Sequence, residues 1–220
     1  MVMSVDYSHI TTAKARELQD KLAKLVIKKT TFSDINVVAG IDVSIRNNRA
    51  IAAIVALSIP KLEVLEKAIA VRPVEFPYVP GLLAFREAPV IFEAFDKLKI
   101  VPDILVVDGQ GYAHPRRLGL ACHLGVELDL PSIGCAKSRL TGIHREPGQK
   151  RGSRVALTDK GETIGAVVRT RENVKPVYIS IGHRIDLDTA VKLILRLCSR
   201  YRLPEPIREA HKTAGSLAVT

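Results

Sequence analysis

Residues 36–71 read NVVAGIDVSIRNNRAIAAIVALSIPKLEVLEKAIAV, an apolar and largely β-branched stretch that two short turns interrupt. Runs of this kind, bounded by turn residues, favour strands, which we expect at 36–45, 50–59 and 62–71. The turns, RNNR and PKL, are too short for a crossover connection, so consecutive strands must run antiparallel. The stretch therefore predicts an antiparallel three-stranded meander.

Helical and strand patterns alternate after this meander. A helix at 82–99 leads to a strand at 104–108, and a helix at 117–128 leads to a strand at 132–135. Helical links of this length allow parallel crossovers. The remaining elements are an amphipathic opening helix, two later strands and a closing helix, expected at 12–29, 163–169, 177–181 and 187–202. This order predicts an α/β fold, a mixed sheet of three antiparallel strands followed by parallel strands, flanked by helices.

The length and charge of the chain limit its class. Its 220 residues, 47% of them hydrophobic, suffice for one core, and no repeat or linker divides them, so a single domain over 1–220 is expected. The formal charge of +10 gives a positive field that attracts polyanions, which makes nucleic acid the leading partner class. Basicity by itself fits a protein adapted for solubility equally well, so the argument also needs a site.

Cysteine usage and the opening residues bear on the compartment. Cys122, Cys135 and Cys198 lie far apart in apolar segments, which indicates buried free thiols and neither a disulfide framework nor a zinc site. The opening MVMSVDYSHI lacks the basic and apolar segments of a secretion signal, and no stretch approaches the roughly 18 apolar residues of a membrane span. A cytoplasmic protein without membrane contact is expected.

Three carboxylates lie in segments whose residue patterns favour a functional acid. Asp42 lies in AGIDVSI, Glu87 in PYVPGLLAFRE and Asp108 in ILVVDGQGYAHP. Asp42 and Asp108 close apolar runs, so we expect both at strand ends, where an open α/β sheet places its ligand site. Their spacing is too irregular for a local metal-binding loop, so the fold must bring them together. Such acids suit a divalent metal that assists phosphodiester cleavage, and a carboxylate that caps nearby amides is the alternative.

Two further segments carry charge in an informative context. In LPEPIREAH, at 203–211, Pro206 can start a short helix with Arg208 and His211 on one face, although a lone histidine is more often a surface residue. The loop TGIHREPGQKRGSR, at 141–154, carries four basic residues that fit either contact with a phosphate backbone or plain solvation.

Five segments together resemble endonuclease V, the family of deoxyinosine 3′ endonucleases also called deoxyribonuclease V. They are AGIDVS, FPYVPGLLAFRE, VVDGQGYAHPRRLGLACHLGV, GCAKSRLTG and KPVYISIGHRIDLDTA, in order between about residues 36 and 211. The resemblance implies a ribonuclease H-like fold, which agrees with the order of elements above. It also implies a DNA repair enzyme that recognises deoxyinosine and hydrolyses the second phosphodiester 3′ of it, leaving a 3′-hydroxyl and a 5′-phosphate.

The resemblance assigns roles to particular residues. Asp42, Glu87 and Asp108 would hold Mg²⁺, with Mn²⁺ as a substitute, and His211 would act as a general acid or position water. A wedge that enters the helix beside the lesion would consist of Pro77, Tyr78, Val79, Pro80 and Gly81. The other substrate-binding positions would be Leu83, Gly109, Gly111, His114, Gly134 and Lys137. From the residues themselves, a turn that buries Tyr78, glycines with turn duty and a solvated lysine are equally open.

Two other functions compete with this one. The first is the same enzyme class acting on inosine in RNA, which would need contacts to the 2′-hydroxyl. Alternatively, the chain is a noncatalytic binder of single strands or junctions, although the presence of all three acids argues against that. A monomer is expected in each case.

Overall fold

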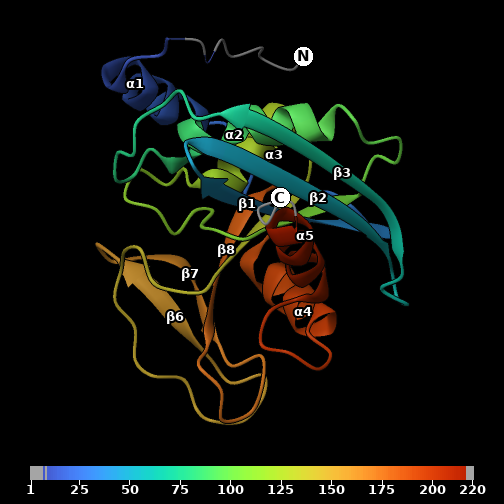
Figure 1. Cartoon of the computed structure of the whole chain (residues 1–220). Helices are drawn as coiled ribbons and strands as arrows, with labels where there is room; N and C mark the ends of the chain where they lie inside the picture. Colours follow the sequence, from blue (N-terminus) through green and yellow to red (C-terminus); the bar gives the residue numbers. More distant parts are fainter. Residues whose placement is uncertain (1–6, 8, 217–220) are drawn as a thin grey trace.

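The computed structural model describes residue 7 and residues 9–216, so most of the opening stretch discussed above lies outside the described residues. The strands are β1 (Val37–Arg46), β2 (Arg49–Ser58), β3 (Val64–Pro73), β4 (Ile104–Val107), β5 (Ser132–Ala136), β6 (Arg154–Asp159), β7 (Glu162–Val168) and β8 (Val177–His183). The helices are α1 (Thr12–Ala23), α2 (Leu83–Phe95), α3 (Leu120–Leu128), α4 (Leu187–Leu197) and α5 (Glu205–Ser216). All of these strands join one sheet in the order β3-β2-β1-β4-β5-β8-β7-β6 (Figure 1).

The sheet topology confirms the expected mixed α/β arrangement. β1 pairs antiparallel with β2, and β2 with β3, which is the predicted meander. β4 then runs parallel to β1, and β5 parallel to β4, as the helical crossovers allow. The last three strands are antiparallel to their neighbours. The parallel pairs therefore lie at the centre of the sheet.

Element boundaries differ from the sequence expectation in several places. The helices predicted at 12–29, 82–99 and 187–202 are shorter in the structure, where α1, α2 and α4 end at Ala23, Phe95 and Leu197. The edge strand β6 was not predicted from the sequence, because half of its residues, RVALTD, are polar and only Leu157 is buried. These ends depend on tertiary packing, because short helical pieces without a buried face are not stable by themselves.

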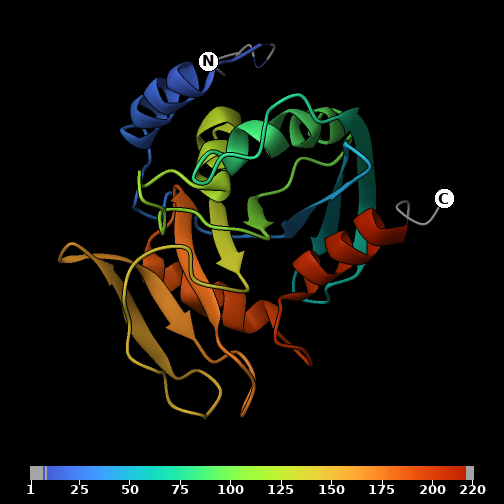
Figure 2. The ribbon, with the colours of Figure 1, turned by 60° about the vertical axis from the view of Figure 1, so that its left-hand side comes forward.

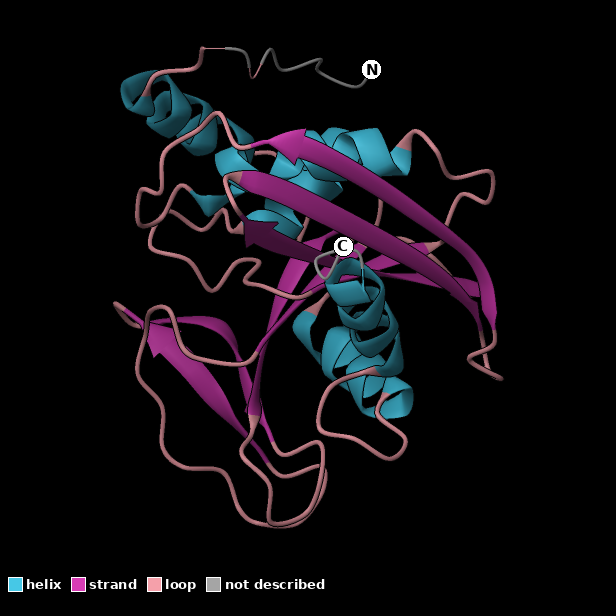
Figure 3. Cartoon of the chain, in the orientation of Figure 1, coloured by secondary structure: helices cyan, strands magenta, loops and turns pink. Residues whose placement is uncertain are grey.

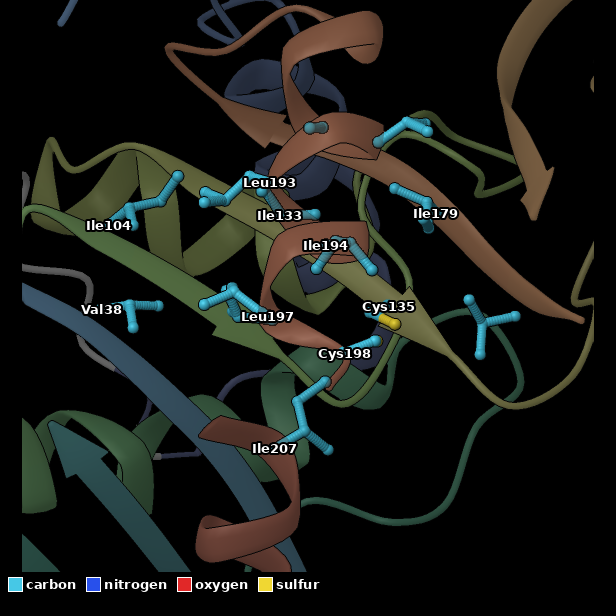
Figure 4. Close-up of a cluster of buried hydrophobic side chains, with 14 of the residues drawn as sticks. Val38, Ile104, Ile133, Cys135, Ile179, Leu193, Ile194, Leu197, Cys198 and Ile207 are labelled. Atoms are coloured by element: carbon cyan, nitrogen blue, oxygen red, sulfur yellow. The ribbon is translucent and has the colours of Figure 1, made fainter. Parts of the chain in front are cut away.

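The helices form two layers around the sheet. α2 and α3 cover one face, α4 and α5 cover the other, and α1 packs outside α3 (Figures 2 and 3). Side chains of β1 alternate between the layers: Val38 joins the core under α4 and α5, while Ala39 and Ile41 join the core under α2 and α3. Figure 4 shows the first of these cores, in which Ile194 of α4 and Ile207 of α5 point toward the strands.

A glycine of β1 sets how closely α5 approaches the sheet. A Cβ on Gly40 would lie 2.0 Å from the carbonyl oxygen of Pro206, in the first turn of α5. Side chains alternate along a strand, so Val38, Gly40 and Asp42 share the face that α5 covers. This close approach brings the next turn of α5, with His211, over Asp42.

Candidate active site

Asp42 occupies a different place from the one expected. The sequence analysis put it at a strand end, but it lies within β1, paired with Ala53 of β2. β4 is the shorter strand and ends at Val107, one residue before Asp108, whose backbone N–H donates to the carbonyl of Ile41 at 2.9 Å. The two aspartates meet because the end of β4 lies beside the middle of β1, and only Asp108 follows the strand-end rule.

The acids and the C-terminal histidine gather into a cluster that fits a divalent cation. Asp42, Asp108 and His211 each offer one ligand atom, and these atoms lie within 4.8 Å of one another. His211 Nδ1 is 2.7 Å from an oxygen of Asp42. Two carboxylates and one imidazole from separate elements leave room for water and a substrate phosphate, as catalytic Mg²⁺ sites do. These residues therefore fit the divalent metal that the sequence predicted.

Glu87, on α2, lies outside this group of ligand atoms, but it is near enough for the charges of Asp42 and Asp108 to act on it. Burial raises the pKa of Glu87 to about 8, and the negative charges of Asp42 and Asp108 add to the rise. Burial also raises the pKa of Asp108, although Lys137 forms an ion pair with it. Acids crowded in this way repel one another, so a cation between them would relieve the repulsion. The electrostatics point to the same ligand as the geometry.

The high pKa of Glu87 makes the stability of the metal-free protein depend on pH. The pKa rises from 4.5 to about 8 on folding, so the folded state binds this proton more tightly. The resulting stabilisation is complete below the unfolded pKa and is lost as the pH rises through the folded pKa. Burial raises the pKa of Glu127 to about 7, which adds the same trend. Burial lowers the pKa of His114 and of His123 to about 4, which opposes this trend below about pH 6.5. We therefore expect the melting temperature in EDTA to fall between about pH 6.5 and 8.

Two matched variants separate Glu87 from Glu127. Both Glu87→Gln and Glu127→Gln should reduce the fall in melting temperature, because each removes one carboxyl with a raised pKa. Only Glu87→Gln should also diminish the proton release that accompanies metal binding at neutral pH. Calorimetric metal titrations in two buffers of different ionisation enthalpy measure that release. Equal proton release from wild type and Glu87→Gln would contradict the assignment.

A cavity of about 130 Å³ opens beside the acids, at the wedge loop. It brings together six of the predicted substrate positions: Tyr78, Val79, Pro80, Gly81, Leu83 and His114. Other residues of its wall were not anticipated, among them Gln19, Gln110, Leu120 and Leu140. Tyr78 is 72% exposed, so the alternative of a turn that buries this ring is wrong. An exposed aromatic ring at the mouth of a cavity suits contact with nucleobases.

The other predicted substrate positions lie outside this cavity wall: Pro77, Gly109, Gly111, Gly134 and Lys137. A Cβ on Gly134 would lie 2.4 Å from the backbone nitrogen of Gly111, and one on Gly111 would lie 2.1 Å from the carbonyl of Ile181. These two glycines therefore let the segment after Asp108 pack directly on β5 and β8. A Cβ on Gly109 would make only ordinary van der Waals contact, with the side chain of Leu120 at 3.9 Å. Their contribution to the base pocket stays a prediction, while their packing fixes the position of Asp108.

His114 is a buried structural contact of the wedge loop. Its Nδ1 accepts a hydrogen bond from the backbone N–H of Arg116 at 3.1 Å, which leaves the proton on Nε2, toward Gly81. Burial and, to a smaller extent, the charge of Arg116 lower the pKa of His114 to about 4. The ring is therefore neutral at physiological pH and holds the loop without adding a positive charge.

Gln19 of α1 is the least expected residue of the site. It is 1% exposed, and its side-chain amide donates to the carbonyls of Gly81 at 3.0 Å and Leu118 at 2.9 Å. Its oxygen accepts from Arg116 Nε at 2.6 Å. In the sequence, this helix shows only an amphipathic pattern. The structure shows that Gln19 ties the wedge loop to the segment before α3.

The basic loop at 141–154 is held largely by bonds within the protein. Arg151 donates to the carbonyls of Leu195 and Cys198, and Arg154 pairs with Asp188 at 2.7 Å. These two side chains support the reading of a surface loop over that of a phosphate contact. The three cysteines are free and buried, as expected. Among the helices of the described residues, none is both long and apolar enough to span a bilayer.

The fold and the carboxylate cluster define the class of ribonuclease H-like, metal-dependent nucleases. The family model for endonuclease V matches residues 20–212. The endonuclease V of Rippkaea orientalis is 52% identical over 205 residues, which cover 92% of this chain and 90% of that protein. The chain therefore belongs to the endonuclease V family, as its sequence predicted.

Solved structures agree with this membership. The crystal structure of endonuclease V from Streptomyces avermitilis superposes with a TM-score of 0.91 at 43% identity, covering 95% of this chain and 93% of that one. Endonuclease V from Ciona intestinalis, solved in complex with a 24-mer DNA that contains an inosine followed by a ribo-adenosine, gives a TM-score of 0.83 at 28% identity. Its alignment covers 94% of this chain and 97% of that one. The expected ribonuclease H-like fold is confirmed.

Proposed function

We propose that residues 1–220 act as one monomeric domain that recognises deoxyinosine in DNA and hydrolyses the second phosphodiester 3′ of it. The products are a 3′-hydroxyl and a 5′-phosphate, and the lesion stays in the strand. The observation that carries this proposal is the acid cluster beside a small cavity with an exposed tyrosine at its mouth. Family membership and the inosine-containing DNA bound by the Ciona relative support it.

Mg²⁺ is the proposed cofactor, with Mn²⁺ as a substitute, and Asp42, Asp108 and Glu87 would hold it. When bound, such an ion lowers the pKa of a water and stabilises negative charge on the phosphate. Glu87 is suited to align the attacking water and take its proton, because it lies near the two aspartates and a bound cation would favour its ionised form. His211 is exposed beside Asp42, where it can donate a proton to the departing 3′-oxygen.

Base recognition and cleavage occupy neighbouring but separate places. The cavity takes the flipped hypoxanthine base, and Tyr78 fills the stacking space that the base leaves. Pro77 and Pro80 limit the conformations of the loop, so less entropy is lost when it enters the duplex. The offset between cavity and acids accounts for a cut beyond the lesion.

Incubation of the purified protein with a labelled duplex containing one deoxyinosine tests this function. We expect nicking at the second phosphodiester 3′ of the lesion in Mg²⁺, none in EDTA, and none in a matched duplex with deoxyadenosine. An inosine-containing RNA in parallel tests the alternative substrate. Cleavage of the RNA alone would show that the substrate is inosine in RNA. Binding of the DNA and the RNA without cleavage of either would favour a noncatalytic binding protein.

Gln19 should affect the selectivity of the enzyme for deoxyinosine. Gln19→Met keeps the volume and loses all three hydrogen bonds, while Gln19→Glu keeps only the acceptor toward Arg116. We expect Gln19→Met to raise KM for the deoxyinosine duplex by about tenfold, because each lost bond leaves a buried carbonyl or donor unpaired. The kcat should change less, since the acids are untouched.

A neighbouring substitution controls for the helix itself. Asp20 is exposed on α1, so Asp20→Asn should leave both KM and kcat unchanged. A Gln19→Met variant with normal KM and normal discrimination against deoxyadenosine would show that the wedge loop holds its position without α1.

A further inference from the structure

A cleft with basic walls adjoins the acids, since its lining residues Lys137 and His211 contact Asp108 and Asp42. Its volume is about 420 Å³, and it lies between the end of β5, the β7–β8 loop, the α4–α5 loop and α5. Five of its lining residues carry a permanent positive charge, and none is acidic: Lys137, Arg171, Arg202, Arg208 and Lys212. A concave surface with one sign of charge concentrates the field toward a counter-ion.

Two of these charges lack a carboxylate partner. Arg171 is exposed, and no hydrogen bond or ion pair involves its side chain among the residues the structure describes. Arg202 donates to the carbonyls of Lys137 at 2.7 Å and Pro176 at 2.8 Å, which fix the guanidinium but do not neutralise it. The other three cations pair with Asp108, Glu205 and Glu209. The cleft therefore keeps a net positive charge after its internal pairs are formed.

The cleft wall is ordered in advance of any ligand. The guanidinium carbon of Arg208 lies 3.3 Å from the ring centroid of Tyr201, and Arg208 bonds Glu205 at 2.6 Å. Arg202 joins the end of β5 to the start of β8 through its two carbonyl contacts. Side chains held in this way lose little entropy when they bind, which favours affinity.

The cleft lies next to the acids at which the phosphodiester would be hydrolysed. Lys137 and His211 line the cleft, and they also contact Asp108 and Asp42 respectively. The cavity at the wedge loop is lined by Gln110, two residues after Asp108. The acids thus have the cavity and the cleft as neighbours. A strand with its base in the cavity and its target phosphate at the acids continues into the cleft on the 3′ side.

We propose that this cleft binds the phosphate backbone of the strand 3′ of the cut, including the 5′-phosphate that cleavage creates. The inference rests on the proposed function for the direction of the strand. Arginine and lysine side chains bind phosphate oxygens without reading sequence, so the cleft would fix register and retain the downstream product.

Binding without catalysis tests the cleft. In EDTA, fluorescence anisotropy compares a short 5′-phosphorylated oligonucleotide without inosine to its 5′-hydroxyl counterpart, over a range of salt. We expect wild type to prefer the 5′-phosphate, and Arg171→Gln to weaken that binding about tenfold. The slope of log affinity against log salt should also fall by about 1. The double variant Arg171→Gln/Lys212→Gln should show a larger loss.

Lys192→Gln provides the matched control. Lys192 is an exposed cation of α4 in a separate groove with Asn36 and Pro60, beyond the amino end of β1. Its neutralisation should leave the preference for the 5′-phosphate unchanged. If Arg171→Gln and the double variant behave like Lys192→Gln, the cleft does not bind the strand. Competition by inorganic phosphate as effective as by the oligonucleotide, at equal ionic strength, would also overturn the assignment to a strand.

A nicking assay separates this inference from the proposed function. Wild type that cuts the deoxyinosine duplex, with cleft variants that retain full 5′-phosphate binding, would refute the cleft alone. If wild type prefers the 5′-phosphorylated oligonucleotide but cuts no inosine-containing substrate, the proposed function is refuted. The cleft would then still bind a phosphate backbone, but the direction of the strand in it would have no basis.

Discussion

Asp42→Asn should abolish metal-dependent nicking while the protein stays folded. The side chain keeps its volume but loses a charged oxygen of the cluster that Asp42 forms with Asp108 and His211. Loss of metal-assisted charge stabilisation amounts to several kcal/mol of activation free energy, and each ~1.4 kcal/mol is tenfold in rate, so we expect kcat to fall by about 10³-fold or more. Single-turnover nicking of the deoxyinosine duplex in Mg²⁺ measures this change.

The same variant should bind metal weakly and melt no lower than wild type in EDTA. The charge of Asp42 contributes to the raised pKa of Glu87, so its removal relieves repulsion in the metal-free protein. Stability gained when function is lost is common at sites that crowd like charges. Asp34→Asn makes the same change at an exposed position near the amino end of β1, and it should alter neither activity nor metal affinity. Full activity of Asp42→Asn would refute the proposed metal site.

Gly40→Ala should destabilise the fold and impair catalysis together. The added methyl group would lie 2.0 Å from the carbonyl oxygen of Pro206 and 2.8 Å from the backbone nitrogen of Ile207. Both atoms are backbone, so α5 must move as a whole. Overpacking of this kind lowers the free energy of unfolding by about 1–3 kcal/mol. Because α5 carries His211, a shift of about 1 Å should reduce kcat by about 10²-fold.

Gly215→Ala is the matched control, since it places the same methyl group later in α5. Nothing lies within 4 Å of a Cβ at that position. Alanine is also the better helix former, so this variant should be as stable as wild type or more so, with normal activity. Chemical denaturation and single-turnover nicking of the two variants decide the question. Equal stability and kcat for both would show that α5 does not depend on its close approach to β1.

Much of the architecture could be predicted because its signals are local. The apolar runs at β1, β2 and β3, with short turns between them, allow only an antiparallel meander. The helical patterns before β4 and β5 allow parallel strands, and both are parallel. β6 shows no such signal, since only one residue of this edge strand, Leu157, is buried and no apolar face reveals it.

The candidate site, too, could be predicted only in part from the sequence. The sequence identified the acids and the wedge through motifs that resemble the family, and the structure brings Asp42, Asp108 and His211 together. It could not place Asp42 correctly, because the level at which β4 ends beside β1 depends on strand register. It gave no sign of Gln19, whose importance comes from two carbonyls, of Gly81 and Leu118, that are distant in the chain.

By itself, then, the sequence determined the order of elements, the basic charge and the set of acids, because periodicity and residue type are properties of neighbouring residues. Only the tertiary structure decided the closeness of α5 to β1, the link from α1 to the wedge loop and the placement of the cavity and the basic cleft beside the acids. These depend on backbone contacts between elements far apart in the chain. A glycine such as Gly40 permits such contacts without indicating, in the sequence, which partner it will meet.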